Sequence, residues 1–158
     1  PPPGTAFVVV DPAQVMSQAS AAEALRAQAE KHRATYQAEV QKQMNDLRNA
    51  DQELARQRTL LSPEAYAQRR RDFEKQVSEA EQATQNRRKE FDRAITEASR
   101  KIEKAMLEIV VEIVQERNYP VVLNKAGVII VQTSLDITPE VIRRMNRKLP
   151  TVAVAVPK

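Results

Sequence analysis

The stretch Leu61-Ser62-Pro63-Glu64 decides the fold, because it holds the only proline between Ala13 and Arg117, an interval that also lacks glycine. Serine is favoured as a helix N-cap and proline at the first helical position, so a helix is expected to begin at Pro63. The two arms, of about 45 and 55 residues, would each reach on the order of 65–80 Å. The sequence therefore predicts a long antiparallel helical hairpin over residues 13–118, with its turn near 61–64.

The composition is typical of a thin helical protein. Of 158 residues, 4% are aromatic and 29% are charged, and the chain contains two glycines and no cysteine. A chain with so little apolar bulk and no disulfide is expected to gain stability by self-association. The lack of cysteine also excludes thiolate metal sites and thiol catalysis. No apolar run approaches the roughly 18–20 residues of a membrane span.

The apolar residues of the arms form sparse stripes. In the first arm Val40, Leu47, Leu54 and Leu61 recur every seven residues, and in the second arm apolar residues step by three or four. Polar residues at or beside these positions predict loose packing of the two helices. The alternative is a stiff coiled coil that carries ordinary surface substitutions.

Both ends of the chain contain short β-branched runs. The run Phe7–Val10 predicts a buried strand, and Val121–Leu123 and Val128–Val131 predict a β-hairpin whose turn ends at Gly127. These strands would form a small β-body at the base of the arms, from residues 1–12 and 119–149. Three strands from one chain leave open edges, so assembly of several chains is expected.

The last elements are a short helix and a tail. Thr138 is expected to cap a helix that reaches about Lys148, with its apolar side chains on one face. The tail, residues 150–158, is either an extra edge strand or disordered, and the sequence does not choose. Pro1-Pro2-Pro3-Gly4 is expected to be a flexible leader, consistent with removal of a signal peptide.

No constellation of residues points to catalysis. The single histidine, His32, lies between Lys31 and Arg33, where a solvated side chain is expected. A chain with two glycines has no Gly-rich phosphate loop. Carboxylates alternate with Lys and Arg, as on solvated helix faces. We therefore expect no enzyme activity, no cofactor and no metal site.

The charge is basic, with a net charge of +4 and a pI near 9.5. The clusters that stand out on the second arm are Arg69, Arg70 and Arg71, and Arg87, Arg88 and Lys89. A basic surface attracts acidic polypeptides or anionic lipid, although it is also typical of a solubilising face. Nucleic acid is not an expected partner, because neighbouring carboxylates dilute both clusters and no reading motif is present.

The order of these elements resembles the Skp/OmpH family of bacterial chaperones. The matching residues are the first strand ending at Asp11, the helical hairpin, and the segment from Tyr119 to Asn146, which includes Asp136-Ile137-Thr138. The resemblance implies a mostly α protein of the α+β class and a periplasmic homotrimer, with helical arms around a cavity. It also implies an ATP-independent holdase for unfolded outer-membrane β-barrel proteins, with lipopolysaccharide as a further partner of basic arm residues.

The family function assigns expected roles to three groups of residues. Apolar arm residues would contact the unfolded client: Tyr36, Val40, Met44, Leu47, Leu54, Leu60, Tyr66 and Phe73. Basic arm residues would steer acidic clients or contact lipopolysaccharide: Arg69, Arg70, Arg71, Arg87, Arg88 and Lys89. The trimer body would be built by Val8, Val10, Val121, Leu123, Ile129 and Val131.

Two rival interpretations use the same elements. A structural adaptor coiled coil would bridge fixed partners, and its β-body would serve only to trimerise it. A prefoldin-like chaperone also combines a coiled coil with a β-base, but its helices lie at both chain ends. Here the predicted strands flank the helical hairpin, which argues against prefoldin.

Overall fold

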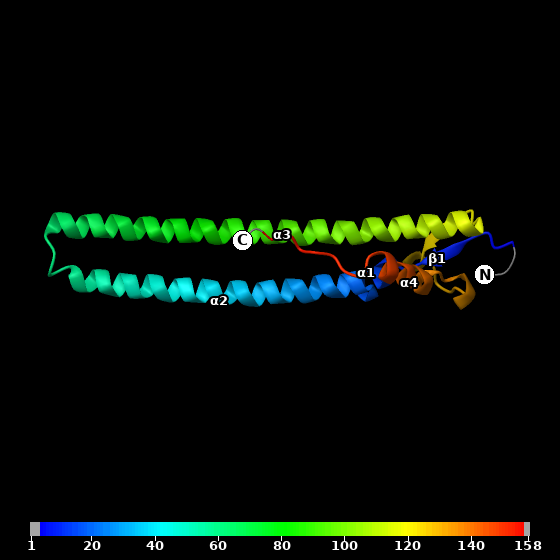
Figure 1. Cartoon of the computed structure of the whole chain (residues 1–158), viewed down its shortest axis with the longest axis horizontal. Coiled ribbons are helices and arrows are strands. Elements are labelled where there is room, and N and C mark those ends of the chain that lie inside the picture. Colours follow the sequence, from blue (N-terminus) through cyan, green and yellow to red (C-terminus); the bar gives the residue numbers. More distant parts are fainter. Residues whose placement is uncertain (1–3, 157–158) are drawn as a thin grey trace. The chain divides into compact units, whose positions relative to one another are not determined.

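The computed structural model describes residues 4–156 and is dominated by two long helices, α2 and α3 (Figure 1). The elements are, in chain order, β1 (Val8–Val10), α1 (Pro12–Gln18), α2 (Ser20–Gln57), α3 (Pro63–Arg117), β2 (Val122–Asn124) and α4 (Thr138–Lys148). The residues form two compact units: a body unit of residues 4–29 and 94–155, and an arm unit of residues 30–93. Most of the predicted leader, Pro1 to Pro3, lies outside the described residues.

The first predicted arm is divided near its start. Asp11 caps α1 by accepting a hydrogen bond from the backbone N–H of Gln14 at 3.0 Å, and Pro12 occupies the first helical turn. Ala19 then has an extended backbone conformation, and the Ser20 N–H donates to the side-chain oxygen of Asn146 at 2.8 Å. The break between α1 and α2 thus frees the Ser20 N–H for a hydrogen bond to α4. The apolar periodicity of the helices does not predict this contact.

The ends of α3 follow from single residues. The Ser62 hydroxyl accepts a hydrogen bond from the Ala65 N–H at 3.2 Å, as expected for an N-cap before Pro63. At the other end Asn118 has a φ of 53°, and the Tyr119 N–H donates to the Val114 carbonyl at 3.1 Å. This is a left-handed C-cap, a conformation that asparagine tolerates better than most residues.

Strands β1 and β2 pair in parallel, with Val8 opposite Val122 and Val10 opposite Asn124. A parallel pair requires a long crossover connection, and the helical excursion between the strands provides it. On its other side β1 makes an isolated parallel bridge from Val9 to Asp136, and the Ile137 N–H donates to the Val9 carbonyl at 2.9 Å. The strand β1 is therefore the centre of the body unit.

The predicted β-hairpin after residue 120 is wrong. Lys125–Gly127 forms a 3-10 turn, in which the Asn124 side chain accepts a hydrogen bond from the Ala126 N–H, and residues 128–132 form no strand. The Val128 N–H donates to the Lys125 carbonyl at 3.0 Å within this turn, so it is not used to pair with a residue of β2. The β-branched residues after Gly127 therefore run away from β2 instead of pairing with it.

The core of the body unit lies where β1 meets the helices. Its fully buried large side chains include Val8 and Val9 of β1, Val15 of α1, and the row Ile102, Ile109 and Ile113 of α3. Helix α4 adds Val141 and Met145 to the same cluster. The three- and four-residue steps of α3 thus become a buried stripe in this part of the chain.

Helix α4 has the predicted bounds, but its first residue has another role. Thr138 is fully buried, and its hydroxyl accepts a hydrogen bond from the Asp11 N–H at 2.9 Å instead of capping α4. The described part of the tail matches neither predicted alternative: residues 151–156 form no strand, yet Val152 is buried in the core. Pro157 and Lys158 lie outside the described residues. The predicted fold class, mostly α with a small β-body and long helices, is confirmed.

Asp136 links two loops of the body unit through charge. It accepts a hydrogen bond from the Lys125 ammonium at 2.7 Å and another from the Thr138 N–H at 2.9 Å. Partial burial alone would raise the pKa of Asp136, but these hydrogen bonds outweigh it and hold the pKa below the ordinary value of 3.8. A carboxyl group with a lowered folded-state pKa stabilises the fold above its unfolded pKa, and this contribution is lost as the pH falls.

We predict that Asp136→Asn lowers the free energy of unfolding by about 1 kcal/mol at pH 7, because the charged hydrogen bond to Lys125 is lost. The difference from the unsubstituted chain should shrink as the pH falls below the unfolded-state pKa, about 4, and through the lowered folded-state pKa of Asp136. Urea unfolding followed by circular dichroism at several pH values measures both effects. Asp46→Asn, at an exposed arm position, is the control and should leave the unfolding curve unchanged; a pH-independent effect of Asp136→Asn would contradict the assignment.

Candidate functional site

The apolar seam of the arm unit is shallow. Between residues 30 and 93, Leu54 is the one hydrophobic side chain that is buried, at 9% exposure. Five of the predicted contact residues are half-buried: Tyr36, Val40, Leu47, Tyr66 and Phe73. Met44 and Leu60 are exposed, at 54% and 80%. The predicted contact residues therefore hold α2 and α3 together with part of their apolar surface and present the rest to the outside.

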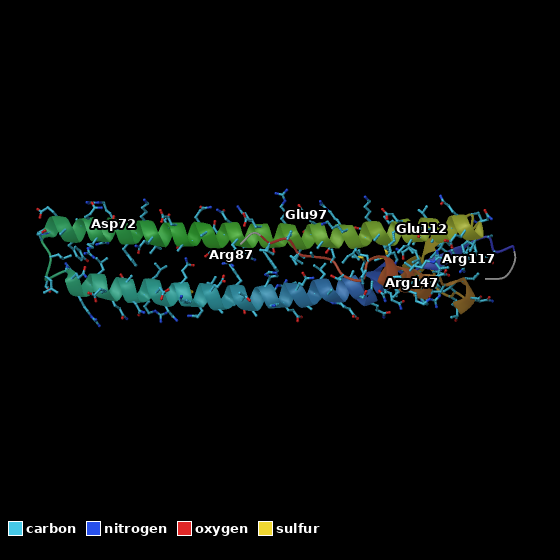
Figure 2. All side chains as sticks on the ribbon, viewed as in Figure 1. Asp72, Arg87, Glu97, Glu112, Arg117 and Arg147 are labelled. Atoms are coloured by element: carbon cyan, nitrogen blue, oxygen red, sulfur yellow. The ribbon has the colours of Figure 1, made fainter. Side chains whose placement is uncertain are left out.

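A groove of about 310 Å³ opens between α2 and α3 within the arm unit. The Tyr36 hydroxyl crosses to α3 and donates to the Thr84 carbonyl at 3.0 Å. Arg87 extends from α3 toward α2 (Figure 2), forms an ion pair with Glu39, and places its guanidinium carbon 6.0 Å from the centre of the Tyr36 ring. The remaining lining mixes Val40 with polar side chains, so the groove offers apolar and hydrogen-bonding contacts together.

The two basic clusters differ from what their sequence suggests, because part of their charge is already paired. Arg70 forms an ion pair with Glu74 at 3.2 Å, and Arg71 donates to the Gln68 side chain at 2.7 Å. Arg87 is engaged by Glu39, as described above. Within the described chain, Arg69, Arg88 and Lys89 are exposed and form no ion pair. These three side chains are the ones available to an external anion.

The predicted trimer-body residues fall into two groups. Val8 and Val10 are buried inside the single chain, because their side chains belong to the hydrophobic cluster that residues of α1, α3 and α4 also form. Val121, Leu123 and Ile129 are exposed, at 46%, 40% and 99%, while Val131 is half-buried. The structure thus brings the first group into the intrachain core and leaves most of the second on the surface.

Further exposed apolar residues of the body unit were not predicted as functional. They are Phe7, Leu107, Val111 and Ile130. Leu107 and Val111 are four residues apart on α3 and therefore share a helix face. They lie on a different face of α3 from the buried row of Ile102, Ile109 and Ile113. A search of the sequence for a second apolar stripe on this helix would therefore have identified them.

Ion pairs fasten α4 to α3. The guanidinium of Arg144 donates to both carboxylate oxygens of Glu116, at 2.8 and 2.6 Å, and to Glu140 at 2.8 Å. These contacts lower the pKa of Glu116, chiefly through the Arg144 hydrogen bond, and raise that of Arg144. Lys148 adds a hydrogen bond to Glu112 at 2.8 Å, which raises the pKa of the lysine. These ion pairs therefore attach the C-terminal half of α4 to α3.

His32 is half-buried rather than solvated, because its ring packs 5.9 Å from the ring of Phe91 at an angle of 56°. Across residues 4–156, no three His, Cys, Asp or Glu side chains are arranged to hold a metal ion. Over the same range no helix is long and apolar enough to cross a membrane.

The comparison with known proteins agrees with this architecture. No curated protein sequence matches the chain. A solved structure from Caulobacter crescentus CB15, described as a candidate outer membrane chaperone (OmpH-like), has a similar fold with a TM-score of 0.88 at 16% identity. The alignment covers 100% of this chain and 94% of the other. The sequence profile described as Outer membrane protein (OmpH-like) matches residues 6–145, which confirms the predicted family. The chain belongs to the OmpH-like family.

Proposed function

We propose that this protein is an ATP-independent holdase chaperone of the periplasm. In this role it binds unfolded outer-membrane β-barrel proteins between its helical arms, prevents their aggregation and aids their delivery to the outer membrane. Membership of the OmpH-like family and the fold shared with a candidate outer membrane chaperone support the proposal. The observation that carries it is the shallow seam of the arm unit, where Leu54 is the one buried hydrophobic residue between residues 30 and 93.

The chemistry of the client explains why a shallow seam is useful. An unfolded barrel protein exposes strands of alternating apolar residues and unpaired backbone groups, both of which promote aggregation. Half-buried side chains such as Tyr36 and Val40 offer contacts that each contribute about 0.5–1 kcal/mol, a fraction of a fully buried side chain. Many weak contacts act together, so the complex is stable although each contact is short-lived.

Charge adds a second contribution to capture. Arg69, Arg88 and Lys89 are exposed and unpaired within the described residues, so they attract acidic segments of a client. The same side chains suit the phosphate groups of lipopolysaccharide or anionic lipid. Nucleic acid is a poor candidate, since carboxylates such as Asp72 and Glu90 neighbour both clusters.

We further propose that three chains assemble through the β-body predicted from the sequence, residues 1–12 and 119–149, and that residues 13–118 form the arm of each chain. The body unit of the structure is larger than this β-body, because it also contains residues 13–29 and 94–118. Within the described residues the sheet has two strands, so one edge of β2 lacks a strand partner. Val121 directly before this strand, Leu123 within it and Ile129 after it are exposed apolar residues. An open edge with apolar neighbours favours pairing with a second copy.

The adaptor alternative uses the same trimer but requires a fixed partner. The first experiment is therefore to dilute a urea-denatured outer-membrane barrel protein into buffer that contains this protein at increasing ratio, without ATP, and to follow light scattering. Suppression that saturates near one client per trimer is expected for a holdase. Unsuppressed aggregation in the presence of intact assembled protein would favour the adaptor.

The apolar arm contacts can be tested directly. We predict that Met44→Ser together with Leu60→Ser raises the concentration needed for half-maximal suppression by about three- to tenfold, because two exposed contacts are lost from each arm. The melting temperature should stay unchanged, since neither side chain is buried. Gln37→Ser together with Gln52→Ser, at exposed polar positions of α2, is the matched control. Equal suppression by both pairs would reject the apolar contacts.

Electrostatic capture predicts a salt-dependent defect. Replacing Arg69, Arg70 and Arg71 by glutamine should slow association with an acidic client several-fold at low ionic strength and leave the rate unchanged at about 0.5 M salt. Stopped-flow fluorescence of a labelled client measures the rate. The control replaces Arg100, Lys101 and Lys104, which are exposed on the body unit, by glutamine, so that the same charge is lost. Equal slowing of client association by the control would show that the net charge of the protein, and not this cluster, determines the rate.

The assembly proposal separates two body positions by burial. Ile129→Asp should dissociate the trimer while each chain keeps its helical circular dichroism, because Ile129 is 99% exposed within one chain. Val10→Asp should unfold the body unit itself, because Val10 is 7% exposed in the intrachain core. Sedimentation velocity and circular dichroism distinguish these results. A folded trimer that persists with Ile129→Asp would overturn this placement of the interface.

A further inference from the structure

The C-terminal segment of the body unit lies on it as an extended chain. In residues 151–155 burial alternates: Val152 is 5% exposed and Val154 is half-buried, whereas Thr151, Ala153 and Ala155 are exposed. A period of two is the pattern of an extended strand that rests one face on a surface. The segment forms no β-ladder, so something other than a neighbouring strand holds its backbone.

The side chain of Gln28 in α2 holds that backbone. Its amide nitrogen donates to the Val152 carbonyl at 2.7 Å, and its amide oxygen accepts from the Val154 N–H at 3.2 Å. One primary amide therefore supplies a donor and an acceptor to two residues of an extended chain, as the backbone of an adjacent strand does. Neither bond involves a side chain of the segment, so this contact does not depend on its sequence.

The surface beneath the segment is apolar. Val152 belongs to the same buried cluster as Leu25 of α2 and as Ala98 and Ile102 of α3, and Val154 packs against that cluster. We call Gln28 and this apolar surface the Gln28 seat. It selects an extended backbone with an apolar side chain at every second position.

The segment is attached more weakly than the helix before it. Helix α4 is held by the Lys148 and Arg144 ion pairs and ends with the Leu149 N–H on the Met145 carbonyl at 2.7 Å. Beyond Pro150, the contacts described above are two hydrogen bonds to Gln28 and the burial of two valines. Release of the segment therefore leaves α4 in place and uncovers the Gln28 seat.

We propose that the Gln28 seat is a binding site for an extended, alternating apolar segment of an unfolded polypeptide, and that residues 151–155 fill it in the free protein as a built-in competitor. The inference rests on the proposed holdase function for the identity of the ligand. Strands of an unfolded β-barrel protein have the required alternation. The tethered segment competes at a high effective concentration, so a single weak strand does not displace it and a client bound at other sites does.

The test uses a fluorescein-labelled peptide with the sequence of residues 150–156 and a chain that ends at Pro150. Fluorescence anisotropy should show saturable binding that unfolded barrel protein competes away. The full chain should bind the peptide at least about tenfold more weakly, because its own segment occupies the seat. In the shortened chain, Gln28→Ala should weaken binding about tenfold through the loss of two hydrogen bonds, whereas Gln37→Ala, at an exposed position of α2, should not.

Two modified peptides isolate the backbone contact. N-methylation at Val154 removes the N–H that donates to Gln28 and should weaken binding, while N-methylation at Ala153 removes an N–H with no partner among the described contacts. Equal binding of both peptides, or binding that ignores Gln28→Ala, would overturn the proposal and leave the segment as a fixed cover. Failure of unfolded barrel protein to compete would overturn the client assignment.

A second variant covers the case in which the shortened chain does not fold. Val152→Asp with Val154→Asp in the full chain should release the segment without removing it, and the same peptide should then bind; no binding to this folded variant would overturn the proposal. Light scattering with the intact chain reports separately on the holdase function. Suppression without peptide binding rejects only the Gln28 seat, while Gln28-dependent peptide binding without suppression supports the seat and rejects the holdase function.

Discussion

The structure depends on the double pairing of β1. One strand of three valines, Val8–Val10, pairs with β2 on one side and bridges to Asp136 on the other. Its backbone pairs on both sides, and Val8 and Val10 pack in the hydrophobic core, so β1 joins the start of the chain to two segments more than a hundred residues later. The long helices α2 and α3 lie between β1 and β2 in the chain, and they form the long crossover connection that a parallel strand pair requires.

This arrangement separates stability from binding. The body unit contains nearly all the buried hydrophobic residues, among them the row Ile102, Ile109 and Ile113, whereas the arm unit buries Leu54. Because the buried core lies in the body unit, the arm unit can keep apolar side chains half-exposed, a state that would be a liability in a protein held together by its coiled coil. The division suits a surface that must contact many sequences weakly.

The candidate binding surfaces share a second physical property, which is that they do not depend on a particular partner sequence. Half-buried aliphatic and aromatic side chains contact any apolar group. Unpaired basic residues attract any acidic segment. The Gln28 amide bonds to backbone atoms alone. Tolerance of this kind accompanies low affinity per contact, and the proposed trimer would compensate by presenting several copies.

Much of the fold followed from local sequence rules. Ser62-Pro63 specified the turn, the glycine-free runs specified the helices, and Phe7–Val10 specified a strand, because capping, helix propensity and β-branching act within a few residues. Of the arm contact residues, Val40, Leu47 and Leu54 follow the seven-residue repeat, whereas the role of the whole set came from the family resemblance. Only the tertiary structure decided that β2 pairs with β1 in parallel instead of with residues 128–131, that Thr138 bonds to Asp11, and that Gln28 holds the tail. These contacts join residues more than a hundred positions apart, and no local pattern encodes which backbone group meets which partner.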